Sequence, residues 1–181
     1  MTVFISGGCK NGKSMFAQRV AVKLADGGKL YYVATMIPYD EEDRARVRRH
    51  VSEREGWGFE TIECGLDILN VLETADENST LLMDSVTALL LNEMFHGDFT
   101  KTGDKSAGEK CARELTELMR RVKNIVFVSD FLYSDAAIYD EFTDTYMQAL
   151  AHVDSTIAKE ADTVVEICAA GRYYHKGGEI L

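Results

Sequence analysis

Residues 7–14 read GGCKNGKS and satisfy G-x-x-x-x-G-K-[ST], the pattern of a phosphate-binding loop, or P-loop. They follow a predicted strand and open a predicted helix, so backbone N–H groups and the helix N-terminus would face a polyphosphate. Lys13 would span the β- and γ-phosphates as a catalytic residue, and the Ser14 hydroxyl would ligate Mg²⁺. The alternative is a glycine-rich turn that only caps a helix. The predicted nucleotide-binding residues are Gly7, Gly8, Cys9, Lys10, Asn11, Gly12, Lys13 and Ser14.

A nucleotide site of this kind also needs a carboxylate at the end of a neighbouring strand, where it holds the water shell of Mg²⁺. The run LLMDS (81–85) supplies Asp84 at a predicted strand end. The alternative is that Asp84 caps the following helix, VTALLLNEMF (86–95). Because the P-loop is present, we interpret Asp84 as a metal-side or nucleotide-contacting residue, with Ser14 as the second metal ligand.

A cluster of arginines surrounds one histidine in DEEDRARVRRHVSER (40–54). Helical spacing places Arg46, His50 and Arg54 at i, i+4 and i+8, with Arg49 beside them. Acidic residues suit the start of a helix, so a solvated helix with acids first and bases later is the alternative. Like charges at i,i+4 repel, however, and an arginine-rich face is better explained if an anion binds there.

If that anion is a nucleoside triphosphate, His50 is a candidate nucleophile. Neighbouring arginines disfavour the imidazolium and leave one ring nitrogen free to attack the α-phosphorus. The guanidinium groups would stabilise charge on the reacting phosphate and on the pyrophosphate that leaves. The product would be a covalent nucleotidyl-histidine from which a second phosphate acceptor collects the nucleotide. An exposed helical histidine without a catalytic role is the alternative.

The composition limits the classes of function. The chain has 181 residues and a formal net charge of -10, which argues against general binding to nucleic acid or to anionic membranes. We expect one domain over residues 1–181, since this length buries a sizeable core. Four scattered cysteines without a CxxC pair indicate neither zinc nor disulfides. Without a basic, apolar leader or a run of ~20 apolar residues, we expect a cytoplasmic protein with no membrane insertion.

Short apolar runs alternate with segments of helical spacing, which predicts an α/β fold with a mainly parallel sheet flanked by helices. The tail AAGRYYHKGG (169–178) is a possible antiparallel hairpin, and HGDFTKTGDKSAGEK (96–110) is a predicted surface loop leading into a helix. The predicted helices include residues 13–25 and 107–122, and the predicted strands are residues 3–6, 30–35, 59–64, 80–85, 124–130 and 163–170.

Four blocks together form a more specific pattern: FISGGCKNGKS (4–14), YVAT (32–35), the arginine-histidine segment (40–54) and LLMDSVTALLLNEMF (81–95). They resemble the adenosylcobinamide kinase / adenosylcobinamide-phosphate guanylyltransferase family, whose helix reads R-[IV]-x-x-H-x-x-x-R. The resemblance implies a P-loop NTPase-like fold and two linked reactions. A kinase step phosphorylates a cobinamide hydroxyl, and a guanylyltransferase step moves GMP from GTP through a histidine to that phosphate.

Carried onto this sequence, the guanylylated histidine is His50, the YVAT block adds Thr35 to the nucleotide site, and the strand-end acid is Asp84. The resemblance also implies Mg²⁺ as a cofactor and ATP, GTP and the corrinoid as substrates. It further implies a homotrimer in which one subunit completes the site of its neighbour.

The second half departs from the family pattern. SDFLYSD (129–135) stands where the family has N-E-V-G, and YMQALAHVDST (146–156) replaces its F-R-D-x-x-G-x-x-N-Q helix. Two alternatives therefore stay open beside the bifunctional enzyme. One is a single-activity P-loop kinase for a small molecule, and the other is a nucleotide-binding regulatory module without turnover.

Overall fold

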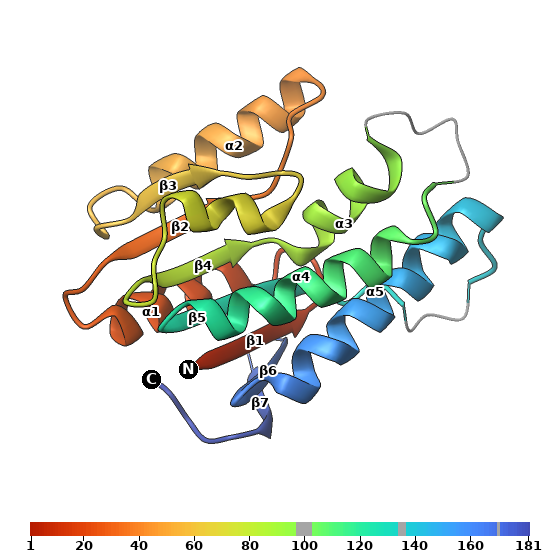
Figure 1. Ribbon diagram of the computed structural model, residues 1–181. Helices are drawn as coiled ribbons and strands as arrows, with labels where there is room; N and C mark the ends of the chain where they lie inside the picture. The colour runs from red at the N-terminus through yellow and green to blue at the C-terminus, as the bar shows by residue number, and fades with distance from the viewer. Residues whose placement is uncertain (97–102, 134–136, 170) are drawn as a thin grey trace.

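A computed structural model describes residues 1–96, 103–133, 137–169 and 171–181 of the chain. Within these residues, seven strands form one sheet in the order β3-β2-β4-β5-β1-β6-β7 (Figure 1). All neighbouring strands from β3 to β6 are parallel, and β7 pairs antiparallel with β6. The predicted parallel sheet and the C-terminal antiparallel hairpin are therefore confirmed. The strands are β1 (Thr2–Gly7), β2 (Leu30–Ala34), β3 (Glu60–Glu63), β4 (Thr80–Asp84), β5 (Asn124–Asp130), β6 (Thr163–Cys168) and β7 (Gly171–Lys176).

Helices cover both faces of the sheet, which explains why the central strands are apolar at almost every position. On one face, α1 packs against side chains such as Ile5 and Val126. On the other, α3, α4 and α5 pack against side chains such as Phe4 and Phe127. The helices are α1 (Lys13–Ala25), α2 (Glu41–Glu53), α3 (Val86–Phe95), α4 (Ala107–Arg121) and α5 (Glu141–Glu160), with the 3-10 helix η1 (Ile68–Glu73).

The helix starts differ in a way that matters for ligand binding. At α2, α3 and α5, the side chains of Asp40, Ser85 and Asp140 each accept a hydrogen bond from the backbone N–H three residues later. In contrast, α1 begins after Gly12, whose φ of 90° is left-handed and which supplies no side-chain cap. Apart from the N–H of Lys13, which donates to Asn11 Oδ1, the first-turn N–H groups of α1 are not taken up by a cap side chain and can face an anion.

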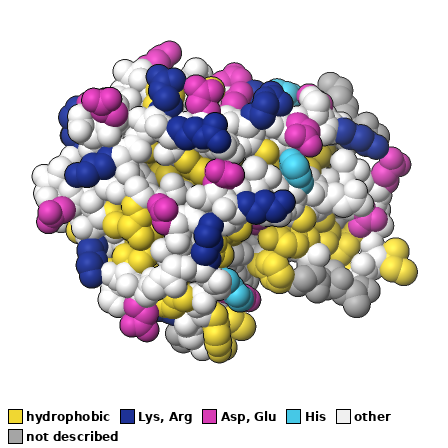
Figure 2. Space-filling model, turned by 60° about the horizontal axis from the view of Figure 1, so that its bottom comes forward, with side chains coloured by type: hydrophobic (Ala, Val, Ile, Leu, Met, Phe, Trp, Pro, Cys, Tyr) yellow, Lys and Arg dark blue, Asp and Glu magenta, His cyan; other side chains and the backbone are white. Residues whose placement is uncertain are grey.

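The helix α2 lies at one edge of the sheet, beside β3 and β2 (Figure 1). It forms where the sequence predicted a charged helix, but none of its residues is buried. Elsewhere on the molecule, Figure 2 shows basic and acidic side chains interspersed on the face that it presents.

Two predicted segments fall partly outside the described residues. In the predicted loop 96–110, residues 97–102 are not described, and α4 already begins at Ala107 because Ala, Glu and Lys favour a helix there. In the tail, residue 170 is not described. No helix among the described residues combines the length and the apolar character needed to cross a bilayer.

One buried side chain, Asn92 of α3, connects the ends of two strands. Its amide donates hydrogen bonds to the carbonyl oxygens of Thr35 (2.8 Å) and Gly65 (2.9 Å), and only 3% of the residue is exposed. We expect Asn92→Ala to lower the free energy of unfolding by roughly 2–4 kcal/mol, because both carbonyl groups lose their donor. Denaturant unfolding would measure the change. The exposed Asn70→Ala is the control, and an equal effect in both variants would contradict this role.

Candidate nucleotide-binding and transfer site

The P-loop is anchored to the sheet at both ends. At its start, Gly7 has a φ of 150°, and a Cβ atom there would collide with the carbonyl oxygen of Ile167 and the amide of Asn11. Asn11 also donates a hydrogen bond to that carbonyl oxygen in β6, while its own side-chain oxygen accepts one from the backbone N–H of Lys13 at 3.3 Å. The glycine and the asparagine therefore fix the loop between β1 and the start of α1.

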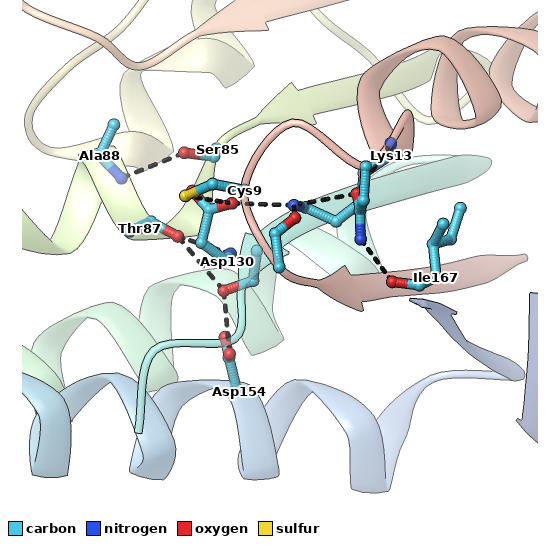
Figure 3. A network of polar contacts seen from close by, with 11 residues as sticks. Cys9, Lys13, Ser85, Thr87, Ala88, Asp130, Asp154 and Ile167 are labelled. Atoms are coloured by element: carbon cyan, nitrogen blue, oxygen red, sulfur yellow. Dashed lines mark hydrogen bonds and ion pairs between the residues drawn. The ribbon is translucent and has the colours of Figure 1, made fainter. Parts of the chain in front are cut away.

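Lys13 is the most buried charged group of this loop, with 5% of the residue exposed. Its ammonium group donates to the carbonyl oxygen of Gly8 at 2.6 Å and forms an ion pair with Asp130 Oδ1 at 2.8 Å. Figure 3 shows Lys13, Cys9 and Asp130 gathered at the carboxyl ends of the strands. The Cys9 thiol lies 3.8 Å from the same carboxylate oxygen. Asp130 is thus the carboxylate that directly faces the P-loop lysine.

Asp84 was expected at the end of a strand next to β1, the strand that leads into the P-loop, but it lies one strand further away. It ends β4, and β5 lies between β4 and β1 in the sheet. The Tyr32 hydroxyl donates to Asp84 Oδ2 at 3.0 Å. Burial, and then the nearby Asp84 carboxylate, raise the pKa of Tyr32 far above its usual range, so Tyr32 stays a donor. Asp84 and Ser14 are both partly exposed, as contact with a metal or a nucleotide requires.

Thr35 is fully buried, and its hydroxyl supports the chain segment that carries Asp84. It donates to the carbonyl oxygen of Ser85 at 2.8 Å and accepts from the Ser85 N–H at 2.7 Å. Its place in the YVAT block is therefore that of a support for the end of β4.

The arginine-histidine helix is partly paired within itself. Glu41 accepts hydrogen bonds from Arg44 at 2.9 Å and Arg48 at 2.8 Å, which hold the pKa of Glu41 below its usual range. Arg46 lies 3.9 Å from the Asp43 carboxylate, and both Arg46 and Arg49 are exposed. The solvated-helix interpretation thus describes the first half of α2 well.

His50 lies in the last turn of α2 with 29% of its side chain exposed. Its Nδ1 atom is shielded from solvent and has no hydrogen-bond partner among the described residues; Glu53 Oε2 is 3.7 Å away. The ring is therefore not tied to a fixed acceptor in the described part of the chain.

Arg54 does not lie where the helical spacing predicted it, on the same exposed face of α2 as Arg46 and His50. The helix ends at Glu53, so Arg54 leaves the helical register and turns inward, where only 8% of it is exposed. Its guanidinium group lies 4.1 Å from the ring centroid of Tyr32 and donates to Thr61 Oγ1 at 3.0 Å. It anchors the end of α2 to the sheet, apart from Arg46, Arg49 and His50.

The fold separates the histidine helix from the P-loop within one chain. Strand β3, which follows α2, lies four positions from β1, or about 19 Å at the usual strand spacing. Because α2 follows the carboxyl end of β2 and leads to the start of β3, its last turn lies toward the amino ends of the strands. The sequence-predicted residues therefore form two groups: the P-loop at the sheet centre and His50 with Arg46 and Arg49 at its edge.

A buried polar network behind Asp130 escaped the sequence analysis (Figure 3). The Asp130 N–H donates to Thr87 Oγ1 at 2.9 Å, and Thr87 Oγ1 lies 3.4 Å from Ser129 Oγ. Ser129 in turn donates to Asp154 Oδ2 at 2.9 Å, as does the Tyr133 hydroxyl at 3.1 Å. The one available sequence signal was an acid at the end of the apolar run NIVFVSD (124–130), the same signal that identified Asp84.

Asp154 is 1% exposed, and its Oδ1 atom has no hydrogen-bond partner among the described residues. Burial raises the pKa of Asp154 to about 7, against the opposing effect of the hydrogen bonds from Ser129 and Tyr133. No group of three His, Cys, Asp or Glu side chains suited to a metal ion occurs in the described ranges. All four cysteines are free.

The parallel sheet and the loop that joins β1 to α1 define a P-loop nucleotide-binding protein. The model of one family, described as cobinamide kinase / cobinamide phosphate guanyltransferase, matches residues 3–175. The chain belongs to this family and is accordingly a kinase and nucleotidyltransferase that acts on cobinamide. The resemblance seen in the sequence is confirmed.

Other comparisons bear on the fold. A search of curated proteins finds no match. The solved structure of an ATPase domain is similar with a TM-score of 0.53 and 12% identity, over 91% of this chain and 68% of that chain. Flagellar accessory protein FlaH from Methanocaldococcus jannaschii has a TM-score of 0.48 and 14% identity, over 99% of this chain and 79% of that one. The likeness to the ATPase domain shows the fold alone.

The raised pKa of Asp154 predicts a pH-dependent contribution to stability. Because the folded-state pKa lies above the ordinary value of 3.8, Asp154 favours folding at low pH, and this contribution is lost as the pH rises through about 7. Asn cannot titrate. The unfolding free energy of the wild type relative to Asp154→Asn should therefore fall by up to roughly 4 kcal/mol between about pH 4 and pH 8. Urea unfolding across this range measures the difference, and a difference independent of pH would contradict the assignment.

Proposed function

We propose that this chain transfers GMP from GTP to cobinamide phosphate through a covalent guanylyl group on His50. The observation that carries the proposal is the position of His50. It is partly exposed, has no hydrogen-bond partner for Nδ1 among the described residues, and lies on a helix with Arg46 and Arg49. A ring without a fixed acceptor can present a nitrogen to phosphorus, and guanidinium groups suit the charge that develops there.

In the first half-reaction, Lys13 and the N–H groups at the start of α1 hold the β- and γ-phosphates. A ring nitrogen of His50 forms a bond to the α-phosphorus of GTP, and the bond from that phosphorus to the bridging oxygen breaks. Pyrophosphate leaves with the electron pair. In the second half-reaction, a phosphate oxygen of cobinamide phosphate attacks the same phosphorus and the P–N bond breaks, which returns His50 and yields GDP-cobinamide.

A magnesium ion fits the oxygen donors that the P-loop and β4 provide. The Ser14 hydroxyl and the Asp84 carboxylate are hard ligands that would hold the ion, with phosphates and water as its further ligands. When bound, the ion would neutralise charge on the phosphates of ATP or GTP. Asp84 keeps an oxygen for this purpose, since Tyr32 donates to Oδ2.

We further propose a homotrimer in which His50 of one subunit serves the P-loop of another. The separation of α2 from the P-loop within one chain supports this arrangement. So does an open pocket of about 800 Å³ between α2 and the edge strand β3, in which Val47, Val51 and Phe59 offer apolar surface. Val51 is 49% exposed and adds to the apolar surface that a neighbouring subunit would cover.

The covalent step predicts a labelled histidine. After incubation with Mg²⁺ and GTP labelled at the α-phosphate, denatured protein should carry an acid-labile, base-stable label on the peptide that contains His50. His50→Ala should reduce the label to background, because no other residue in the site forms the P–N bond. The exposed His152→Ala is the matched control and should keep the label. An unlabelled wild-type protein that binds GTP would sink the covalent mechanism and leave a single-activity kinase.

Site sharing predicts rescue between two inactive variants. The Lys13→Ala variant loses the contact to the phosphates of GTP, and the His50→Ala variant loses the histidine that takes up GMP. Neither variant should therefore be labelled alone. When they are co-expressed at equal levels, the random population of trimers should recover about a quarter of the wild-type label, since that fraction of all subunit contacts pairs an intact P-loop with an intact histidine. Mass spectrometry should find the label on the Lys13→Ala chain. Mixed oligomers, verified by two affinity tags, that stay unlabelled would count against sharing.

A further inference from the structure

Asp130 has no role in the nucleotide chemistry described so far, yet it is the acid in direct contact with Lys13. The ion pair measures 2.8 Å, and 29% of the Asp130 side chain is exposed against 6% for Lys13. The carboxylate therefore lies at the surface of the site while the lysine lies beneath. A substrate that approaches the phosphates from solvent would meet Asp130 first.

Lys13 cannot serve Asp130 and a phosphate in the same way at once. Its ammonium group has three protons and already faces Gly8 O at 2.6 Å, Asp130 Oδ1 at 2.8 Å and Asn11 Oδ1 at 3.5 Å. When a γ-phosphate arrives, the charged Asp130 becomes the competing acceptor. Because Asp130 is fixed at the end of β5 and the γ-phosphate would take over its contact with Lys13, the carboxylate stays beside the γ-phosphate.

Asp130 is also held firmly in place. Residues 125–130 of β5 pair with the whole of β1, so Asp130 is aligned with Gly7 at the start of the P-loop. Its backbone N–H is fixed by Thr87, and the neighbouring Ser129 is fixed by the buried Asp154. A carboxylate on a rigid strand keeps its oxygen atoms at the fixed position that a proton acceptor needs in phosphoryl transfer.

From this geometry we propose that Asp130 is the catalytic base of the kinase reaction and that Lys13 masks it until a nucleotide binds. The cobinamide hydroxyl gives its proton to the Asp130 carboxylate while its oxygen forms the bond to the γ-phosphorus. The bond from the γ-phosphorus to the β–γ bridging oxygen breaks, and the nucleoside diphosphate leaves with that electron pair. Lys13, now on the phosphates, stabilises the charge.

The two reactions of the family make this proposal testable, because only one of them needs a base. The kinase acceptor is a hydroxyl that must lose its proton, whereas the guanylyl acceptor is a phosphate that is already ionised. Loss of Asp130 should therefore affect kinase turnover selectively. Asp84 is a less suitable base because it lies one strand further from β1 and already accepts from Tyr32.

The experiment compares Asp130→Asn with the wild type in three assays: γ-phosphate transfer from ATP to cobinamide, labelling of His50 by GTP, and nucleotide affinity. Asn keeps the size of the side chain and a hydrogen-bond acceptor for Lys13. We expect kcat of the kinase to fall by about 10²–10⁴-fold, with little change in the KM for cobinamide. Labelling should persist, and nucleotide affinity should stay equal or increase because Lys13 loses a charged competitor. Asp130→Glu should recover part of the kinase activity, and the exposed Asp144→Asn should match the wild type.

Two results would overturn the proposal: kinase turnover in Asp130→Asn within tenfold of the wild type, or equal losses of kinase activity and nucleotide affinity, which would indicate a structural or metal-binding role. The kinase assay does not involve His50. An unlabelled wild-type protein would therefore count against the guanylyl-histidine alone, while the kinase and affinity data would still decide the role of Asp130.

Discussion

A lysine ammonium group that is removed from water must be neutralised and hydrogen-bonded, and this requirement organises the centre of the site. Lys13 is positioned by α1, and α1 packs on the same sheet whose strands β1 and β5 bring Gly8 and Asp130 within reach. The parallel pairing of β1 with β5 is therefore the structural condition for the P-loop lysine to be charged at its buried position. On our proposal, a nucleotide that enters this site replaces one anionic partner of Lys13, Asp130, with another, its phosphates.

The helix α2 obeys a different balance of forces. It buries no residue, and its exposed ion pairs contribute little because water screens them. Its cap at Asp40 and the inward-turned Arg54 hold its two ends, while the turns between them rest on no core. Such a helix can shift at a much smaller cost than α1 or α4, which bury apolar faces. A rigid phosphate site and a weakly held helix α2 are compatible with the proposed transfer of a nucleotide from the P-loop to His50.

Local patterns in the sequence were sufficient for the strands, the P-loop and the charged helix, because each depends on residues close together in the chain. Sheet order is not local. The sequence placed Asp84 on a neighbour of β1, but β5 occupies that position, and so Asp130 faces Lys13. Arg54 differed for a similar reason, since periodicity alone could not show that the helix ends at Glu53. The Ser129–Asp154 contact joins positions 25 residues apart and could be found only from the packing of α5 on the sheet.

The two segments that depart from the family pattern meet in space. Ser129 and Tyr133 belong to the first segment and Asp154 to the second. The hydroxyl groups of Ser129 and Tyr133 both donate hydrogen bonds to Oδ2 of Asp154. Tyr146, also in the second, donates to the carbonyl oxygen of Thr87 at 2.9 Å, and the hydroxyl of Thr87 holds the backbone of Asp130. The departures are therefore one connected polar unit behind the end of β5, since a change in one partner leaves a buried group unpaired unless the other changes too. The P-loop, in contrast, keeps the family sequence, and Gly7 and Asn11 fix its backbone between β1 and α1. Asp130 itself lies in the first of these segments, so the acid that faces Lys13 and the network that supports it both belong to the part of the chain that departs from the family pattern.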